Sequence, residues 1–288
     1  MPDISKVGVV GCGLMGSGIA EVCARAGLDV LVAEADRSAA VAGRDRVAGS
    51  LRRAVRNGKL DREAGEAALE RLAYTVDLGD LADRDLVVEA IAEREDAKVH
   101  VFGLLDKIVE REDALLASNT SSIPVMKLGM ATARPDRVVG LHFFNPVPVL
   151  GLVEMVSSLL TSDDTARRAE EFATTVLGKR VIRSQDRAGF VVNALLIPYL
   201  LSAVRMLESG FASAEDIDTG MVLGCAHPMG PLRLADLIGL DTTKAVADSL
   251  FEEFKEPLYA APPLLQRMVD AGLTGRKSGR GFYTYERG

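Results

Sequence analysis

The chain has 288 residues, 48% of them hydrophobic, and a formal net charge of −7, as expected of a folded globular protein. The negative charge excludes an overall basic surface, so we expect no nucleic-acid partner. The most apolar stretch, 191–207, is interrupted by Asn193, Pro198 and Arg205, which predicts a buried helix and no membrane span. Three cysteines without metal-ligand spacing predict no metal site and a reducing, cytoplasmic location.

Residues 6–33 have the pattern of a strand, a tight turn, a helix and a second strand. An apolar run from Lys6 to Val10 ends at Gly11. Over 14–26 the apolar residues recur at helical spacing, and 29–33 is a second apolar run. This is the size of a βαβ unit. Its continuously apolar strands predict a parallel sheet with both faces covered.

The same alternation continues to about residue 184, and the later part of the chain is different. Helical patterning over 38–72 is predicted to break at Asn57-Gly58. Further helices are predicted at 93–109 and 165–177, and further strands at 85–91, 114–118, 137–144, 152–156 and 179–183. From residue 190 onward the pattern is helical. We therefore predict an α/β domain over residues 1–184 and an all-α domain over residues 185–288.

The turn after the first strand has the form G-x-G-x-x-G, with glycines at Gly11, Gly13 and Gly16. In a βαβ unit the first glycine permits the tight turn, the second lets a pyrophosphate approach, and the third lets helix and strand pack closely. Leu14 and Met15 begin the helix, so we expect their N–H groups to face the phosphates. The sequence therefore predicts a dinucleotide site.

An acidic residue ends the second strand, roughly 20 residues after the glycine motif, where such folds bind the adenosine ribose. That residue is Glu34, with Asp36 as a competing candidate. A carboxylate here repels a 2′-phosphate, which favours NAD over NADP, although Arg37 lies close enough to weaken that preference. The alternative is a solvated carboxylate at the end of a strand.

The chain has three histidines, and His142 is the candidate acid–base residue. His100 lies in a charged helix and His227 precedes a proline in a glycine-rich turn, so both are read as structural or surface residues. His142 lies near the carboxyl end of an apolar strand, where α/β sheets bind ligands. Glu154 lies within the next apolar strand and needs a partner there. If the strands pair across the Asn145–Pro148 turn, the two form a dyad. Otherwise they are an unrelated core histidine and a surface glutamate.

Six segments together resemble one enzyme family, the short-chain L-3-hydroxyacyl-CoA dehydrogenases, and particularly the bacterial 3-hydroxybutyryl-CoA dehydrogenases. The glycine motif is common to many dehydrogenases, whereas His-Phe-Phe-Asn-Pro followed by Leu-Val-Glu is far more specific. The matching segments are 11–18 (GCGLMGSG), 117–122 (ASNTSS), 142–146 (HFFNP), 189–193 (GFVVN), 227–231 (HPMGP) and 275–283 (GRKSGRGFY).

This resemblance implies a Rossmann-like, doubly wound, mostly parallel sheet followed by an all-α domain that binds substrate and forms a homodimer. It implies reversible NAD-dependent oxidation of (S)-3-hydroxyacyl-CoA, such as 3-hydroxybutyryl-CoA, to 3-oxoacyl-CoA, a reaction of fatty-acid and butanoate metabolism. His142 is the implied base and Glu154 its orienting carboxylate, while Ser121 and Asn193 hold the substrate's oxygen.

Further residues are implied to bind the cofactor and the CoA moiety. The implied cofactor residues, beyond the glycine motif with Leu14 and Met15, are Glu34, Glu93, Lys98 and Asn119. The candidate ligands of the CoA phosphates are Arg52, Arg53, Arg56 and Lys59.

The chain departs from the family's usual residues at three places, namely Ala194 for arginine, the pair Leu150-Gly151 for Met-Lys, and Val222 for lysine. None belongs to the His142–Glu154 pair. Two other functions stay open on the sequence. One is a dehydrogenase of the same fold that acts on a free hydroxy acid. The other is a non-catalytic relative that binds a dinucleotide or serves a structural purpose.

Overall fold

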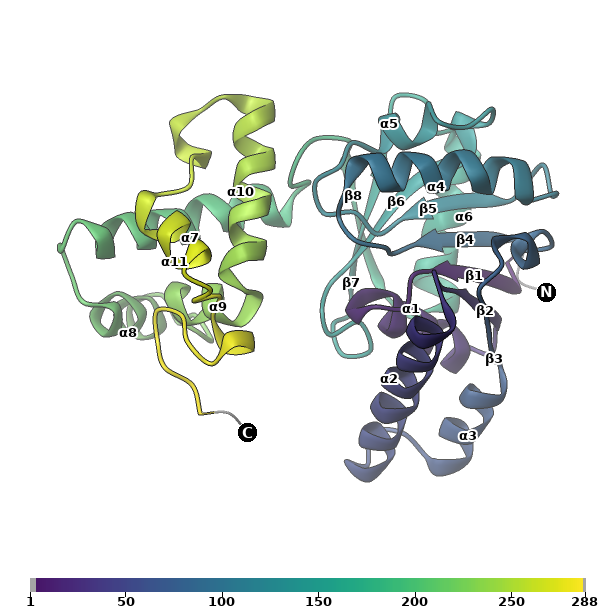
Figure 1. The fold of residues 1–288 in the computed structure, drawn as a ribbon, viewed down its shortest axis with the longest axis horizontal. Helices are drawn as coiled ribbons and strands as arrows, with labels where there is room; N and C mark the ends of the chain where they lie inside the picture. Colours follow the sequence, from purple (N-terminus) through teal and green to yellow (C-terminus); the bar gives the residue numbers. More distant parts are fainter. Residues whose placement is uncertain (1–3, 287–288) are drawn as a thin grey trace. The chain divides into compact units, whose positions relative to one another are not determined.

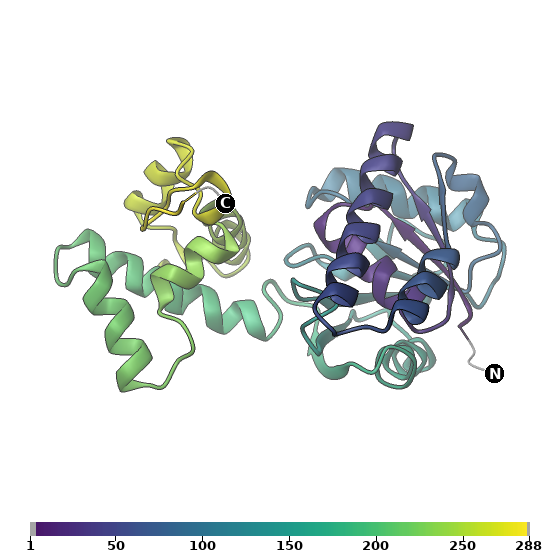
Figure 2. The ribbon, with the colours of Figure 1, turned by 90° about the horizontal axis from the view of Figure 1, so that it is seen from below.

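The computed structural model describes residues 4–286 and divides into two units (Figures 1 and 2). The division falls after Arg187, and each unit has its own hydrophobic core. The boundary predicted at residue 184 falls inside the last strand of the first unit, which runs to Gln185.

An eight-stranded sheet forms the centre of the first unit. Its strands are β1 (Lys6–Val10), β2 (Asp29–Ala33), β3 (Leu72–Thr75), β4 (Leu86–Glu89), β5 (Leu115–Ser118), β6 (Val138–Phe143), β7 (Leu152–Ser157) and β8 (Arg180–Gln185). They lie in the order β3-β2-β1-β4-β5-β6-β7-β8, and all neighbours are parallel except the β6–β7 pair. The chain order reverses between β1 and β4. In open α/β sheets, ligands bind at such a point, outside the carboxyl ends of the strands.

Helices connect the parallel strands and cover the sheet. They are α1 (Leu14–Arg25), α2 (Arg37–Arg56), α3 (Arg62–Glu70), α4 (Glu95–Ile108), α5 (Val125–Gly129) and α6 (Asp163–Glu171), with short 3₁₀ turns at Leu78–Leu81 and Pro135–Arg137 and a π-helical turn at Phe172–Val176. The β1-to-β2 and β4-to-β5 connections run in opposite directions across the sheet. Right-handed crossovers therefore place α1 and α4 on opposite faces.

The burial of the strands explains their sequence pattern. Every residue of β4 and β5 is buried, as are four of the five in β1, whereas the edge strands β3 and β8 are partly exposed. A strand covered on both faces reads as a continuous apolar run. The predicted doubly wound, mostly parallel sheet is confirmed.

One strand departs from the sequence prediction. The helical pattern was expected to continue to Leu72, but the last helix of that stretch, α3, ends at Glu70 and β3 follows at once. With four residues, this edge strand is too short to show alternation, and hydrogen bonds to β2 determine it. The predicted break at Asn57-Gly58 is confirmed, because α2 ends at Arg56 and Gly58 has a φ of +66°.

The turn between β6 and β7 is held in place by neighbouring elements. It contains a cis peptide bond between Asn145 and Pro146. The ammonium of Lys179 donates to the carbonyl oxygens of Val147 and Leu150, each at 2.7 Å. Gly18 of α1 lies so close to Val147 that an added Cβ would approach the valine Cβ to 2.8 Å. The β6–β7 hairpin is thus fixed both from α1 and from Lys179, the residue before β8.

The second unit is helical, as predicted. Its helices are α7 (Val192–Glu208), α8 (Ala214–Gly224), α9 (Pro231–Ile238), α10 (Leu240–Phe254) and α11 (Pro263–Asp270), with 3₁₀ turns at Pro257–Tyr259 and Arg276–Ser278. Buried Asp236 accepts the N–H groups of Phe282 and Tyr283, each at 3.0 Å, and so attaches the last described segment to α9. None of the helices in residues 4–286 is long and apolar enough to cross a membrane.

Candidate active site

The glycine turn between β1 and α1 has the geometry that the motif predicts. Gly11 has a φ of +87°, a conformation that favours glycine. A Cβ on Gly16 would lie 1.8 Å from the carbonyl oxygen of Gly11, so α1 packs against the turn only with glycine there. A Cβ on Gly13 would meet nothing within 4 Å, so this side of the turn is open. Leu14 and Met15 follow as the first residues of α1. The turn therefore fits a pyrophosphate, with glycine backbone and a helix N-terminus facing it.

Glu34 and Asp36, the two competing acids, have different structural positions. Glu34 directly follows β2, and its carboxylate accepts a hydrogen bond from the N–H of Cys12 in the glycine turn. Asp36 instead caps α2 by accepting the N–H of Ala39 at 2.9 Å. Glu34 is therefore the acid beside the predicted dinucleotide site. Arg46 of α2, which was not predicted from the sequence to lie here, donates a hydrogen bond of 2.5 Å to the carbonyl oxygen of Cys12.

His142 and Glu154 lie directly opposite each other in the antiparallel β6–β7 pair. The distance from His142 Nδ1 to Glu154 Oε2 is 2.7 Å, and the two residues are 5% and 0% exposed. Because a carboxylate only accepts, Nδ1 carries the proton, and in the neutral ring Nε2 keeps its lone pair. The ring of Phe144 packs on the imidazole, with centroids 4.6 Å apart. The strand pairing that a dyad requires is therefore present, and the two side chains share a hydrogen bond.

Ser121 and Asn119 follow β5, the neighbour of β6, and both bond to residues of β6 or its end. Ser121 Oγ lies 3.1 Å from Nε2 of His142. The side-chain oxygen of Asn119 accepts the N–H of Phe143 at 2.9 Å. The carboxyl ends of β5 and β6 thus place a hydroxyl and a histidine side by side. This arrangement can accept or donate a proton at Nε2 while binding an oxygen of a ligand.

A carboxylate outside the sheet holds the turn that carries Ser121. Oε1 of Glu93 accepts hydrogen bonds from the Thr120 hydroxyl at 2.6 Å and from the N–H groups of Ser121 and Ser122 at 2.8 and 3.2 Å. Burial raises the pKa of Glu93, but the Lys98 ammonium and the bonds from Thr120 and Ser121 outweigh it, so the pKa lies below its usual value. Glu93 is therefore held as a carboxylate beside the Ser121 turn.

Lys98 has a different environment from the one expected of a cofactor ligand. It is 0% exposed on α4, with its ammonium 2.7 and 2.9 Å from the two oxygens of Glu89 and 3.2 Å from Glu93. Glu89, at the end of β4, also accepts the Ser118 hydroxyl at 2.6 Å. Neither Glu89 nor Ser118 was predicted from the sequence to belong to the site. The argument that singled out Glu154, an ionisable residue within a buried strand, applies equally to Glu89.

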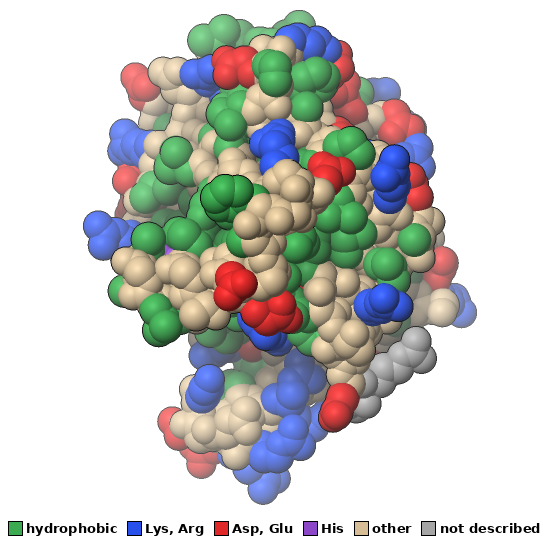
Figure 3. All heavy atoms as spheres, turned by 90° about the vertical axis from the view of Figure 1, so that its left-hand side faces the viewer, with side chains coloured by type: hydrophobic (Ala, Val, Ile, Leu, Met, Phe, Trp, Pro, Cys, Tyr) green, Lys and Arg blue, Asp and Glu red, His purple; other side chains and the backbone are tan. Residues whose placement is uncertain are grey.

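The remaining expected residues lie elsewhere on the two units. Asn193 is the second residue of α7 in the helical unit. Arg52, Arg53, Arg56 and Lys59 are exposed at the end of α2. Blue side chains gather at the lower end of Figure 3, which α2 and α3 reach in Figure 1. At about 1.5 Å per residue, Arg52 lies roughly 20 Å along the helix from Arg37. Only a long ligand can contact both ends of α2.

The other two histidines are not part of this arrangement. His100 is exposed on α4. Nδ1 of His227 lies 3.1 Å from the hydroxyl of Tyr199, a contact within the helical unit. Both observations agree with the surface and structural roles expected from the sequence.

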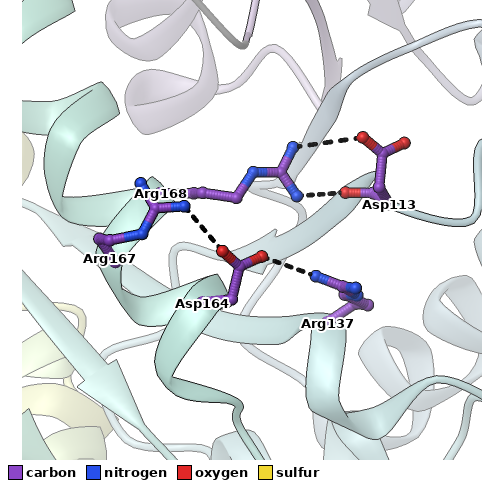
Figure 4. A pocket seen from close by; sticks show the side chains of 5 residues that line it. All are labelled: Asp113, Arg137, Asp164, Arg167 and Arg168. Atoms are coloured by element: carbon purple, nitrogen blue, oxygen red, sulfur yellow. Dashed lines mark hydrogen bonds and ion pairs between the residues drawn. The ribbon is translucent and has the colours of Figure 1, made fainter.

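A polar hollow in the first unit is a separate feature (Figure 4). Its lining residues are Asp113, Arg137, Asp164, Arg167 and Arg168. Asp164 bridges Arg167 at 2.7 Å and Arg137 at 3.1 Å. Because Asp113 and Arg137 precede β5 and β6, the hollow lies at the amino ends of these strands, opposite His142. Its charges are used in ion pairs among the lining residues.

Comparisons with known proteins agree with this geometry in both units. The 3-hydroxyacyl-CoA dehydrogenase NAD-binding domain matches residues 6–187, and the C-terminal domain of the same family matches residues 189–285. The 3-hydroxybutyryl-CoA dehydrogenase of Mycobacterium tuberculosis is 61% identical over 282 residues, covering 98% of this chain and 99% of that protein. Human mitochondrial hydroxyacyl-coenzyme A dehydrogenase is 41% identical over 290 residues, covering 98% and 92%.

A solved structure extends the likeness to three dimensions. The crystal structure of (S)-3-hydroxybutyryl-CoA dehydrogenase from Ralstonia eutropha has a TM-score of 0.93 and 46% identity, and the match covers 99% of this chain and 100% of that one. The two domain matches span nearly the whole chain, and the relatives are aligned along almost all of their length. The chain therefore belongs to the 3-hydroxyacyl-CoA dehydrogenase family.

Proposed function

We propose that the protein catalyses the reversible NAD-dependent oxidation of (S)-3-hydroxybutyryl-CoA to acetoacetyl-CoA. The observation that carries the proposal is the row of contacts from buried Glu154 through buried His142 to half-buried Ser121. The two contacts are 2.7 and 3.1 Å long and lie at the carboxyl ends of β5 and β6. The similar proteins from Mycobacterium tuberculosis and Ralstonia eutropha are both named 3-hydroxybutyryl-CoA dehydrogenases. The reaction belongs to fatty-acid and butanoate metabolism.

The glycine turn and Glu34 hold the cofactor in this proposal. Gly11, Gly13 and Gly16 with the first N–H groups of α1 bind the diphosphate, and Glu34 binds the adenosine ribose and disfavours a 2′-phosphate. Asn119 lies beside the nicotinamide. Bound NAD⁺ supplies the hydride acceptor. We assign Lys98 to the support of Glu93 and not to a direct cofactor contact, because its ammonium is buried against two carboxylates.

His142 moves the proton of the substrate's hydroxyl. In the oxidative direction its Nε2 lone pair takes the proton from the C3 hydroxyl, because an alcohol that loses hydride must also lose this proton. Glu154 keeps Nδ1 protonated before the transfer and stabilises the imidazolium after it, as the carboxylate does in a hydrolase triad. Ser121 donates a hydrogen bond to the reacting oxygen. In the reducing direction His142 returns the proton.

The cationic end of α2 is the proposed contact for the phosphates of CoA. Arg52, Arg53, Arg56 and Lys59 are exposed there. A CoA thioester is long and anionic, whereas a free hydroxy acid has no charge that would reach this segment. The preference for a thioester therefore depends on these residues.

The protein acts as a homodimer formed through the helical unit, in the cytoplasm. Large apolar side chains are exposed on this unit, including Leu195 at 73%, Phe211 at 79% and Leu223 at 79%, and green side chains are numerous in Figure 3. Exposed apolar patches mark contacts with a partner. The free thiols of Cys12, Cys23 and Cys225 suit a reducing compartment.

The decisive experiment follows absorbance at 340 nm with purified protein, acetoacetyl-CoA and either NADH or NADPH, and repeats it with free acetoacetate. We expect NADH to be oxidised with the thioester, and little turnover with NADPH or the free acid. Equal turnover of free acetoacetate would favour the hydroxy-acid alternative. Folded protein that binds NADH and turns over neither substrate would favour the non-catalytic one.

A further inference from the structure

The turn that carries Ser121 is connected through Glu93 to a fully buried ion pair, Glu89–Lys98. Oε1 of Glu93 holds the backbone of Ser121, and Oε2 of Glu93 lies 3.2 Å from the Lys98 ammonium. Lys98 is in turn held more closely by Glu89, at 2.7 and 2.9 Å. A continuous row of contacts therefore runs from β4 through α4 to the hydroxyl beside His142.

Glu89 is fixed from several directions. Its Oε1 accepts the N–H of Ile91 at 2.7 Å, and its Oε2 accepts the hydroxyl of Ser118 at 2.6 Å. Both Glu89 and Lys98 are 0% exposed. A buried ion pair is expensive in desolvation and is often no more stabilising than apolar residues of the same volume. Stability alone is therefore a weak reason for charges here.

The charge balance of the group explains what Glu89 contributes. Glu89 and Glu93 share one cation, Lys98. If Glu89 were neutral, the full attraction of the Lys98 ammonium would act on Glu93, whose Oε1 now serves the donors of Thr120, Ser121 and Ser122. Movement of Glu93 toward Lys98 would release the turn. Because the Lys98 ammonium pairs with Glu89, Glu93 can keep its hydrogen bonds to the turn that carries Ser121.

We infer that Glu89 is a positioning residue for the dehydrogenase reaction, acting through Lys98 and Glu93 to hold Ser121 beside Nε2 of His142. The inference rests on the proposed function for its kinetic consequence. Its structural part, the linkage of Glu89 to the Ser121 turn, does not depend on the reaction catalysed.

A double-mutant cycle with Ser121 tests the inference. Glu89→Gln keeps the shape of the side chain and removes its charge. We expect it to lower kcat about 10- to 100-fold, the effect of a small misplacement of a group that binds the reacting oxygen. In a Ser121→Ala background the same change should alter kcat less than about twofold, because the residue through which Glu89 acts is already absent. If Glu89→Gln lowers kcat by the same factor in the wild type and in Ser121→Ala, the two residues act independently and the inference is wrong.

Hydrogen exchange supplies a readout that needs no activity. In Glu89→Gln the amides of Ser121 and Ser122 should exchange faster than in the wild type. The matched control is Asp106→Asn, which breaks the partly buried Asp106–Arg134 pair at 3.0 Å on the same helix, α4. It should leave kcat and these two amides unchanged. If Glu89→Gln does not fold, Ser118→Ala, which removes one donor to Glu89, takes its place in the cycle.

The outcomes separate this inference from the proposed function. A wild-type protein that does not reduce acetoacetyl-CoA refutes the proposed function, while the exchange of Ser121 and Ser122 still decides the linkage. An active wild type whose Ser121 and Ser122 amides are unaffected by Glu89→Gln refutes only the positioning role.

Discussion

Two contacts to one imidazole ring determine what His142 can do. Glu154 accepts the proton of Nδ1 at 2.7 Å, and Ser121 approaches Nε2 at 3.1 Å. The carboxylate thereby fixes the tautomer, and the lone pair of Nε2 faces the Ser121 hydroxyl. Glu154 is 0% exposed, and a carboxylate buried to this extent requires a partner. The same pairing satisfies the fold and the proposed chemistry.

At this scale we predict that His142→Ala loses turnover but retains NADH binding. General acid–base catalysis contributes about 100- to 10,000-fold, so kcat for acetoacetyl-CoA reduction should fall by that range. The Kd for NADH, measured by fluorescence titration, should change little, because the dinucleotide contacts the glycine turn. The exposed His100→Ala is the control and should behave as the wild type. Near-normal turnover in His142→Ala would refute its role as the base.

At the scale of elements, the glycine turn uses each glycine for a different reason. Gly16 lets α1 approach the turn, since its Cβ would lie 1.8 Å from the Gly11 oxygen. Gly13 has space around it in the protein alone and an ordinary φ of −64°. Gly16 is thus needed for folding, whereas the protein alone places no steric limit on a side chain at Gly13.

This difference predicts opposite behaviour of two alanine variants. Gly16→Ala forces α1 off the turn, so we expect a loss of about 1–3 kcal/mol in the free energy of unfolding together with loss of NADH binding. Gly13→Ala should unfold within about 1 kcal/mol of the wild type but bind NADH weakly. Denaturant unfolding and NADH titration distinguish the two. Tight NADH binding by Gly13→Ala would contradict the assignment of the turn as the pyrophosphate site.

The start of β1 depends on one carboxylate. Oδ2 of Asp85 accepts the N–H groups of Ser5 and Lys6, each at 2.8 Å, and Oδ1 pairs with Arg111 at 2.5 Å. Burial raises the pKa of Asp85, but the backbone bonds from Ser5 and Lys6, the Ser5 hydroxyl and the Arg111 charge outweigh it, so the pKa lies below its usual value.

The sign of this shift makes the stabilisation dependent on pH. A carboxyl group with a depressed pKa contributes stability above its unfolded pKa, about 3.9, and loses it as the pH falls through the lower folded value. We predict that Asp85→Asn costs about 1–3 kcal/mol at pH 7. The difference from the wild type should shrink below about pH 4, as urea unfolding at several pH values would measure. A difference that stays constant down to pH 3 would contradict it.

At the scale of the whole molecule, several large apolar side chains of the helical unit are exposed in the single chain. Leu195 on α7, Phe211 before α8, and Leu223 on α8 are each more than 70% exposed. Burial of one such side chain stabilises by about 1.5–3 kcal/mol. A dimer interface that covers these side chains gains this stabilisation for each one that it buries.

We therefore predict a dimer by light scattering, and a shift toward monomer in Leu223→Asp and in Leu195→Asp. An aspartate placed in an apolar interface is buried without a partner, which opposes association. Leu159→Asp is the matched control, since Leu159 is 92% exposed but belongs to the first unit, and it should remain dimeric. A monomeric wild type would refute the proposed assembly.

The sequence alone determined the parts of this protein that are local. The glycine turn, the apolar central strands and the helical character of the second unit follow from residue spacing, because turn geometry and hydrophobic periodicity operate over a few residues. It also singled out His142 and Glu154, since few ionisable residues occur in apolar strands. The family resemblance supplied Ser121, Glu93 and Lys98.

Only the tertiary structure decided contacts between segments far apart in the chain. The edge strand β3 forms because it can hydrogen-bond to β2. Four residues are too few for the sequence pattern to predict that pairing. The family resemblance favours Glu34 over Asp36, and the fold adds the hydrogen bond that Glu34 accepts from Cys12 in another turn. The link from Glu89 through Lys98 and Glu93 to Ser121 joins β4, α4 and the turn after β5. Periodicity reports which side of an element is buried, whereas ion pairing depends on which elements the fold brings together.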